Sequence, residues 1–492
     1  MMPVELDNVL HSDAPIAVVE APAGCGKTHS AVEYAKQAAA DFKKGNILLL
    51  SHTHAACSVF ETRTRDRSNR INVNTIDSFC MQLVSPYAAA LNLPSPLERH
   101  VGNHPGGVRY DHLPEKAVEL LTRAPSIASV VAACYPVIIL DEHQDASIAQ
   151  HKIMQILNEV GGSKLRIFGD PMQAIYDDDE GIVDWPYLWE TAHGRHMLDT
   201  PHRWADNIPL GNWILDSRTA LKAGQRVRAD KKIITVTSAT GLAGFRRISD
   251  RSTCSQIIHQ FQRLQGSKVI LAFGNDMVRS IAEVSAWRII INEGARIEAL
   301  EDFVGKIITT NGKPSTMASD FLDFMADMGA GLGDDVRNPL KGRLGTVRIN
   351  KQRAGQNQTS FLDPLEFIYA SPDHKGIAQA AKAYFQQPPH NYQVRRAEPI
   401  RILISLGASE DPRLVLSTLA RARRNKTPPD AMVSTIHKAK GMEFDHVLVL
   451  PVDRHQYPQN AKAAKTLYVA LSRARRSIHL VTSSDSPSPH FG

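Results

Sequence analysis

One short run of residues constrains this chain more than any other. Residues 21–28 read Ala-Pro-Ala-Gly-Cys-Gly-Lys-Thr, directly after the apolar run 16–19 and directly before the alanine-rich stretch 31–40. Glycines let a backbone turn tightly so that its N–H groups point at phosphate oxygens, and the start of a helix attracts anions. The order strand, glycine-rich loop, helix therefore predicts a phosphate-binding loop at the edge of a parallel sheet.

The residues of this loop have separate expected roles. Lys27 is expected to reach the β- and γ-phosphates of a nucleoside triphosphate, and Thr28 is expected to bind magnesium. The backbone that would cradle the phosphates is that of Ala23, Gly24, Cys25 and Gly26. The pattern thus predicts ATP and Mg²⁺ as cofactors.

A second segment supplies acidic chemistry. Four apolar residues, 137–140, lead directly into Asp141 and Glu142. A carboxylate at a strand end can hold the magnesium, and its neighbour can polarise the attacking water. We therefore predict Asp141 as a magnesium ligand and both carboxylates as catalytic.

The bulk composition is that of a globular protein. The chain has 492 residues, 43% of them apolar, and a net charge of +6, which is compatible with a polyanionic partner without proving one. Its five cysteines show no metal-type spacing and are expected to be reduced. We see no signal peptide and no apolar run of membrane-spanning length, so a cytoplasmic protein without a membrane partner is expected.

Apolar runs of strand length occur in two groups. The first group is 16–19, 47–50, 137–140 and 165–168, and the second is 233–236, 269–273, 432–435, 447–450 and 478–481. Runs that are apolar throughout and separated by helical patterns indicate parallel strands covered on both faces. We predict an α/β fold with two lobes, each interrupted by a mainly helical insertion. The expected boundaries are 1–80 with 135–200 for the first lobe, 81–134 for its insertion, 201–285 with 430–492 for the second lobe, and 286–429 for the larger insertion.

Six further segments establish a resemblance to superfamily 1 DNA helicases of the UvrD/PcrA/Rep type, whose two lobes are RecA-like. Asp-Glu-His-Gln-Asp (141–145), the segment 169–176 and the segment 198–203 resemble the family's motifs II, III and IV. Thr-Ile-Asp-Ser-Phe (75–79) resembles a family segment that lies along single-stranded DNA. Residues 434–445 and 468–476 are similar to motifs V and VI.

The resemblance implies roles for residues on both sides of a cleft. It implies that Gln173 senses the γ-phosphate, that Arg203 and Arg473 are arginine fingers supplied by the second lobe, and that Glu443 contacts the ribose, with Gly441 beside the nucleotide. It also implies DNA contacts for Thr75, Phe79, Tyr176, Thr435 and His437. At motif Ia the chain has His52, Thr53 and His54, where the two histidines either contact the strand or are ordinary loop residues.

The chain departs from the family pattern in three places. Residues 1–15 contain no glutamine that could select adenine, so the preference between ATP and GTP is open. Four acids, 177–180, replace the family's Trp-Arg pair, and Trp185 or Trp189 either stacks on a base instead or packs in the core. Both insertions are short.

Two functions follow as hypotheses. The first is an ATP-dependent translocase that moves 3′ to 5′ on single-stranded DNA and unwinds tailed duplex. The second is a DNA- or nucleotide-sensing ATPase subunit that regulates a partner nuclease in antiphage defence, of which the Gabija type is one example, with little unwinding of its own.

Overall fold

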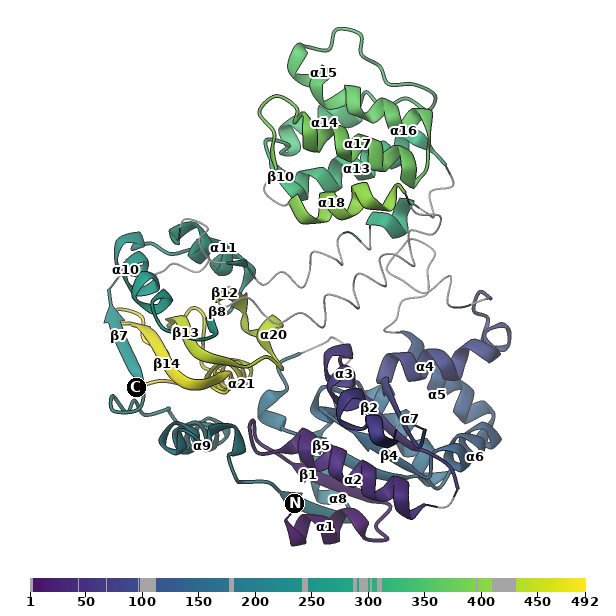
Figure 1. Cartoon of the computed structure of the whole chain (residues 1–492), viewed down its shortest axis with the longest axis vertical. Coiled ribbons are helices and arrows are strands. Elements are labelled where there is room, and N and C mark those ends of the chain that lie inside the picture. Colours follow the sequence, from purple (N-terminus) through teal and green to yellow (C-terminus); the bar gives the residue numbers. More distant parts are fainter. Residues whose placement is uncertain are drawn as a thin grey trace. The chain divides into compact units, whose positions relative to one another are not determined.

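The computed structural model describes most of the chain. The described residues are 3–42, 44–67, 69–95, 97, 112–176, 181–240, 247–285, 290–291, 300, 303–307, 312–394, 397–408 and 431–492. The chain divides into two compact units (Figure 1). The first consists of Met1–Leu91, Asp111–Glu293 and Thr427–Gly492, and the second of Asn92–Tyr110 and Gly294–Lys426.

The first unit contains two parallel sheets, and the first of these carries the phosphate loop. Its strand order is β3-β2-β4-β5-β1-β6. The strands are β1 (Ile16–Glu20), β2 (Ile47–Ser51), β3 (Ile71–Thr75), β4 (Val137–Leu140), β5 (Lys164–Gly169) and β6 (Gly194–Met197). The helices are α1 (Val4–His11), α2 (Lys27–Asp41), α3 (His54–Arg63), α4 (Ile76–Val84), α5 (Leu113–Arg123), α6 (Pro125–Cys134), α7 (Ile148–Glu159) and α8 (Trp185–Thr191). Successive residues such as Val18 and Val19 are both fully buried, so the central strands are covered on both faces.

The second sheet has the strand order β7-β14-β13-β8-β12-β9. Its strands are β7 (Thr235–Ala239), β8 (Lys268–Ala272), β9 (Ile290–Ile291), β12 (Ala431–Thr435), β13 (Phe444–Val452) and β14 (Ala474–Ser483). One face packs with α9 (Ile208–Lys222) and α21 (Ala461–Leu471). The other face packs with α10 (Arg251–Gln262) and α11 (Asn275–Val284).

The expected α/β fold with two parallel sheets is confirmed, and the differences lie at the sheet edges. β3, β6 and β9 were not predicted, and β7 begins two residues later than expected. Each of these four strands is an edge strand of its sheet. Edge strands are less covered by helices, and three of these four lack the continuous apolar run that marks a central strand.

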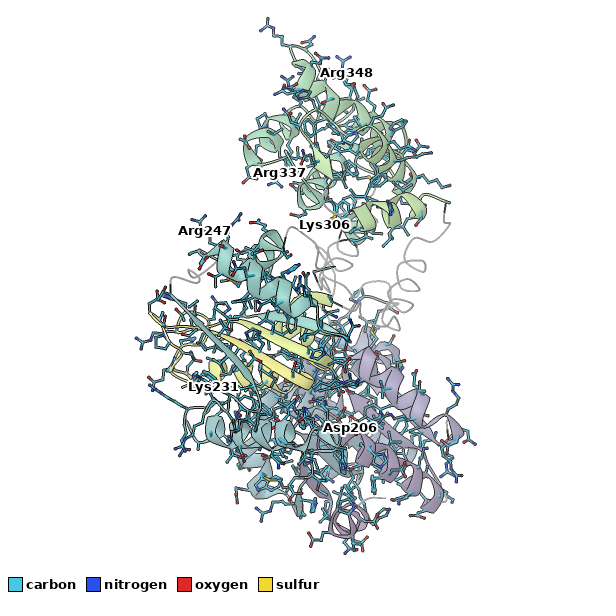
Figure 2. All side chains as sticks on the ribbon, turned by 60° about the vertical axis from the view of Figure 1, so that its left-hand side comes forward. Asp206, Lys231, Arg247, Lys306, Arg337 and Arg348 are labelled. Atoms are coloured by element: carbon cyan, nitrogen blue, oxygen red, sulfur yellow. The ribbon has the colours of Figure 1, made fainter. Side chains whose placement is uncertain are left out.

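The second unit is a helical bundle with its own apolar core. Its helices are α13 (Pro314–Met328), α14 (Asp334–Lys341), α15 (Gln356–Leu362), α16 (Glu366–Ala370), α17 (His374–Gln386) and α18 (Ala397–Leu406), with the short antiparallel pair β10 (Gly329–Ala330) and β11 (Gln393–Val394). Phe321 and Tyr384 are fully buried in this core. Arg348, on the turn between α14 and α15, extends into solvent (Figure 2).

Among the described residues, no single helix has the length and apolar character needed to cross a membrane. In the described part of the chain, the pair α5 and α6 taken together meets those criteria, and the two helices are bent by 106° at their junction.

Candidate functional site

The phosphate loop joins β1 to α2, as the sequence predicted. Gly24 and Gly26 have φ angles of 76° and 83°, the left-handed region that glycine enters without strain. A Cβ at Gly24 would also lie 2.7 Å from the Trp204 ring and 2.8 Å from Cβ of Arg203. Glycine is therefore required here both by the turn and by the close approach of a neighbouring segment.

Lys27, at the start of α2, is buried between the two predicted carboxylates. It forms an ion pair with Glu142, and its Nζ lies 3.9 Å from Oδ1 of Asp141. Burial works against its charge, but these two carboxylates outweigh burial and raise the pKa of Lys27. Burial raises the pKa of Asp141, whereas Lys27 and Lys440 overcome burial and lower the pKa of Glu142. Glu142 is therefore the more acidic carboxylate of the pair.

Glu142 has an unusual backbone conformation for a residue with a side chain. Its φ of 56° and ψ of 33° are left-handed, which costs an L-residue about 1–2 kcal/mol. Its carboxylate accepts a hydrogen bond of 2.6 Å from Gln144 Nε2. Strain of this kind is common at catalytic positions, where it fixes a side chain that the relaxed backbone would not place there.

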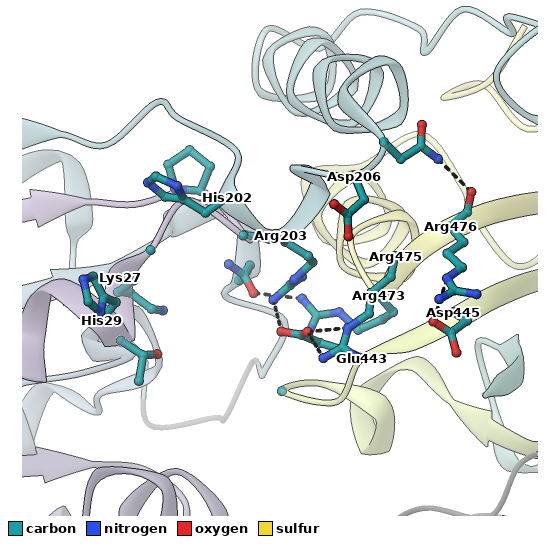
Figure 3. A pocket seen from close by; sticks show the side chains of 18 of the residues that line it. Lys27, His29, His202, Arg203, Asp206, Glu443, Asp445, Arg473, Arg475 and Arg476 are labelled. Atoms are coloured by element: carbon teal, nitrogen blue, oxygen red, sulfur yellow. Dashed lines mark hydrogen bonds and ion pairs between the residues drawn. The ribbon is translucent and has the colours of Figure 1, made fainter. Parts of the chain in front are cut away.

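The loop opens on a cavity of about 870 Å³. Figure 3 shows Lys27 and His29 on one side of it and Arg203, Glu443, Arg473, Arg475 and Arg476 on the other. Of the predicted nucleotide-site residues, those that line the cavity are Ala23, Gly24, Gly26, Lys27, Thr28, Glu142, Gln173, Arg203, Gly441, Glu443 and Arg473. Cys25 and Asp141 are not among the lining residues; both are buried, with exposed fractions of 1% and 4%.

Arg203 lies at the junction of the two lobes. It belongs to the turn His202–Trp204, between β6 of the first sheet and α9, which packs on the second sheet. Its backbone N–H donates to the Gly24 carbonyl at 3.1 Å. Its guanidinium donates to the Ser472 carbonyl at 2.6 Å, so this residue contacts both sides of the cavity.

Arg473 follows α21 and is only 2% exposed. Its guanidinium donates to Oε1 of Gln173 at 3.2 Å and to the Met442 carbonyl at 3.3 Å. Burial, and then the nearby Arg203, lower the pKa of Arg473 to about 10, which still leaves it charged at neutral pH. The two predicted arginine fingers and the predicted γ-phosphate sensor thus line the same cavity.

Glu443 pairs with two arginines that line the same cavity. Its two carboxylate oxygens bind Arg203 and Arg475 at 2.5 and 2.8 Å. Burial opposes its charge, but Arg203 and Arg475 lower the pKa of Glu443 overall. The carboxylate therefore acts as a counter-ion of the arginines here, and the ribose contact stays a prediction.

The predicted magnesium ligands fit a hard cation. Asp141 Oδ1 is buried and accepts no hydrogen bond from the described residues. A carboxylate oxygen left in this way is the kind of ligand that Mg²⁺ takes, and magnesium at phosphate sites needs only one or two protein ligands. Thr28, one residue after Lys27, lines the same cavity.

Several residues with predicted DNA contacts also have structural roles. Thr53, Thr75 and Thr435 each cap the helix that follows, with a side-chain oxygen that accepts a backbone N–H. Thr75 and Phe79 are both 5% exposed, and Thr435 is 6% exposed. The DNA contacts of these residues stay predictions. His54 is the first residue of α3.

His52 is turned towards the nucleotide site. Burial, with Lys440 and Lys27 nearby, lowers the pKa of His52 to about 4 although Glu142 opposes this shift. Its imidazole is therefore neutral at neutral pH, and the DNA contact of His52 stays a prediction.

Tyr176 and His437 do lie together, where the first sheet's motif III meets the second lobe. The Tyr176 hydroxyl donates to the His437 carbonyl at 3.2 Å, and the two rings are 6.0 Å apart. Tyr176 is 39% exposed, and Lys440 Nζ lies 4.8 Å from its ring centre. The acidic run 177–180 lies outside the described residues.

Sequence reasoning missed several residues of this region. Lys440 pairs with Asp145 and donates to the Gln173 carbonyl, although only its neighbours in motif V were predicted. Trp185 is buried against Gly169 and donates to Glu20 at 3.2 Å, so it packs in the core, while Trp189 is half-buried. The most important residue that sequence reasoning missed is Tyr468. It lies in motif VI, but no sequence pattern shows its contacts.

Comparisons with known proteins give two family matches. Residues 8–178 match the AAA domain, and residues 430–481 match the UvrD-like helicase C-terminal domain. Among solved structures, the crystal structure of Pif1 helicase from Candida albicans is similar, with 14% identity, 98% of this chain and 94% of that chain covered, and a TM-score of 0.40. No curated protein matches the chain.

Proposed function

We propose, from the premise that this chain is a superfamily 1 UvrD-like helicase, that it hydrolyses ATP to move 3′ to 5′ along single-stranded DNA and to unwind tailed duplex. The observation that carries the proposal is a single cavity lined by Lys27, Glu142 and Arg473. These residues come from the first loop, the first sheet's acidic turn and the second lobe. Such a cavity can couple phosphate chemistry to a change in how the lobes meet.

The phosphate side of the reaction rests on α2 and its loop. Lys27 and the backbone of 24–28 would hold the β- and γ-phosphates, whose oxygens would compete with Glu142 for the lysine. Thr28 and Asp141 would hold Mg²⁺, which when bound neutralises phosphate charge.

The remaining steps belong to side chains around the γ-phosphate. Glu142, ionised and fixed by its strained backbone, would accept a proton from the attacking water. Gln173 would contact the γ-phosphate, and Arg203 and Arg473 would stabilise the charge of the transferring phosphoryl group. An arginine in this role is worth about 10³-fold or more in rate.

The DNA side would use the exposed ring of Tyr176 and its neighbour His437. Aromatic side chains of this kind stack on bases with little sequence preference. The 3′ to 5′ direction follows from the family resemblance, and a cytoplasmic setting follows from the sequence features given above; both remain proposals.

A second function is favoured by the burial of Thr75, Phe79 and Thr435. With fewer residues free to grip a strand, the chain would act as a DNA- or nucleotide-sensing ATPase subunit that regulates a partner nuclease in phage defence. The acids at 177–180 favour the same function, because they would repel phosphates.

One set of assays tests both functions. Steady-state ATP hydrolysis is measured with and without single-stranded DNA, beside unwinding of duplexes that carry a 3′ tail, a 5′ tail or no tail. DNA-stimulated hydrolysis with unwinding of the 3′-tailed duplex supports the motor. Unwinding of the 5′-tailed duplex alone would refute the direction, and stimulation without any unwinding would favour the sensor.

Two variants test the site itself. Lys27→Ala should abolish turnover because the phosphates lose their charge partner, and Glu142→Gln should bind ATP without hydrolysing it. Lys36→Ala is the matched control, since this lysine lies on the same helix, pairs with Asp66 and is not among the cavity-lining residues. Wild-type hydrolysis in Lys27→Ala or Glu142→Gln would show that the site is assigned wrongly.

A further inference from the structure

A buried tyrosine of the second lobe reaches the phosphate loop. Tyr468, in the last part of α21, is fully buried. Its hydroxyl accepts a hydrogen bond of 2.9 Å from the backbone N–H of Ala23, the residue just before Gly24. Two elements 445 positions apart in the sequence are therefore joined by one buried hydrogen bond.

The same hydroxyl donates to Oδ2 of Asp170 at 3.1 Å. Burial raises the pKa of Tyr468 far above neutral pH, so the hydroxyl keeps its proton for this bond. Asp170 follows β5 and is fully buried, and Arg218 binds its other oxygen at 2.7 Å. The carboxylate is thus fixed from two sides, and Tyr468 supplies one of them.

Asp170 in turn orients Gln173. Nε2 of Gln173 donates to Oδ2 of Asp170 at 3.0 Å, which leaves Oε1 of Gln173 directed at Arg473. Tyr468 and Arg473 lie five positions apart in one segment and hold the two ends of the 170–173 turn. A continuous path of hydrogen bonds therefore runs from the loop amide through Tyr468, Asp170 and Gln173 to Arg473.

We propose that Tyr468 is a positioning residue that transmits the state of the phosphate loop to Gln173 and Arg473, and so makes the site discriminate a triphosphate from a diphosphate. The inference rests on the proposed nucleotide site and deepens it. Tyr468 does not line the cavity among the residues described there; it acts through Asp170. Buried networks of this kind bind more strongly as a unit than their separate bonds suggest.

The test is Tyr468→Phe, which removes the hydroxyl and keeps the ring. Equilibrium binding of ADP and of a non-hydrolysable ATP analogue, both with Mg²⁺, is measured on the full chain. We expect the affinity for the analogue to fall about tenfold, the equivalent of about 1.4 kcal/mol, while the affinity for ADP stays within about threefold. Equal weakening of both ligands, or no change in either, would overturn the proposal.

The chain offers a matched control. Tyr457 is also fully buried in the same core, but its hydroxyl has no hydrogen-bond partner among the described residues. Tyr457→Phe should therefore leave both affinities unchanged. Because the readout is binding, a wild-type chain that bound triphosphate selectively without hydrolysing it would refute the proposed function and leave this inference standing.

A double-mutant cycle tests the route. If Tyr468 acts through Gln173, adding Tyr468→Phe to Gln173→Ala should cause no further loss of analogue affinity, whereas additive losses would refute the route. Asp170→Asn serves if Tyr468→Phe does not fold. It keeps the shape of the carboxylate and an oxygen for Arg218 but puts an amide donor where Tyr468 and Gln173 donate, and it should show the same selective loss.

Discussion

At the scale of single residues, the turn that carries Glu142 packs on a buried pair of histidines. His143 follows Glu142 and is 1% exposed, and its Nε2 lies 3.0 Å from Nδ1 of His151 on α7. Burial lowers the pKa of His151 to about 4 and that of His143 well below its ordinary value, where His151 and His52 add to the effect. Both rings are therefore neutral in the folded protein.

This pair predicts a pH-dependent contribution to stability. In the unfolded chain a histidine takes up a proton below about pH 6.5, whereas folded His151 does so only near pH 4, so stability is lost as pH falls through this window. His151→Gln lacks this titration. As the pH falls from 6 to 5, the free energy of unfolding of this variant minus that of the wild type should therefore increase by about 1.4 kcal/mol per pH unit. Urea unfolding at several pH values checks this, with the exposed His193→Gln as control. A difference that does not vary with pH would contradict it.

Single residues also show how much of the candidate site could be predicted from the sequence. Lys27 and Glu142 were predicted because their chemistry requires one residue type at a fixed distance from glycines or an apolar strand, and Arg473 was predicted through the family resemblance of motif VI. Lys440 and Tyr468 were not, because their partners lie in segments hundreds of positions away, and only the folded chain brings them together.

At the scale of elements, an arginine within the mostly apolar strand β5 connects this strand to the end of α1. Arg166 lies in the middle of a strand expected to be apolar and is 1% exposed. Its guanidinium donates to the carbonyls of Leu10, Ser12, Ala14 and Leu165 at 2.6 to 3.0 Å. The last carbonyls of a helix have no partner within the helix, and this side chain satisfies those that follow the end of α1.

Arg166→Lys should therefore be far from conservative. A lysine has no planar fork and cannot bind several carbonyls at once, so we expect a loss of about 3 kcal/mol in the free energy of unfolding. Denaturant unfolding measures it. Arg195→Lys on β6 of the same sheet is the control: Arg195 is exposed, pairs only with Glu190 among the described residues, and should change stability by less than about 0.5 kcal/mol. Equal effects of the two variants would refute this role.

Elements also show which strands the sequence reveals. The central strands were found because helices cover both faces and most of their positions are apolar. β3 reads Ile-Asn-Val-Asn-Thr and β6 reads Gly-Arg-His-Met, and both are edge strands. Their polar positions face less crowded surroundings, so no continuous apolar run marks them.

At the scale of the whole molecule, the helical unit is a separate folding core. Its buried residues, among them Phe321, Leu365 and Tyr384, cluster with one another. The cavity-lining residues all belong to the other unit. The cavity-lining residues and the core of the helical bundle therefore belong to separate units.

Replacing residues 294–426 by a flexible Gly-Ser linker should leave a protein that still binds nucleotide. We expect ADP affinity within about threefold of wild type and a single cooperative thermal transition, because no core residue of the sheets is removed. Calorimetry and equilibrium binding check this. Removing only residues 334–386 is the contrasting variant, since it cuts through the helical core and should aggregate. Loss of nucleotide binding in the first variant would show that the units are interdependent.

The insertion leaves the second sheet at β9 and returns at β12, and these two strands are hydrogen-bonded neighbours. The inserted segment therefore begins and ends at adjacent strands of one sheet. During evolution such a segment can be lengthened, shortened or exchanged without a change in the strand order of the sheet that carries it. Through such changes a lineage can bind new substrates with the inserted segment, while the cavity, whose lining residues belong to the first unit, is inherited unchanged.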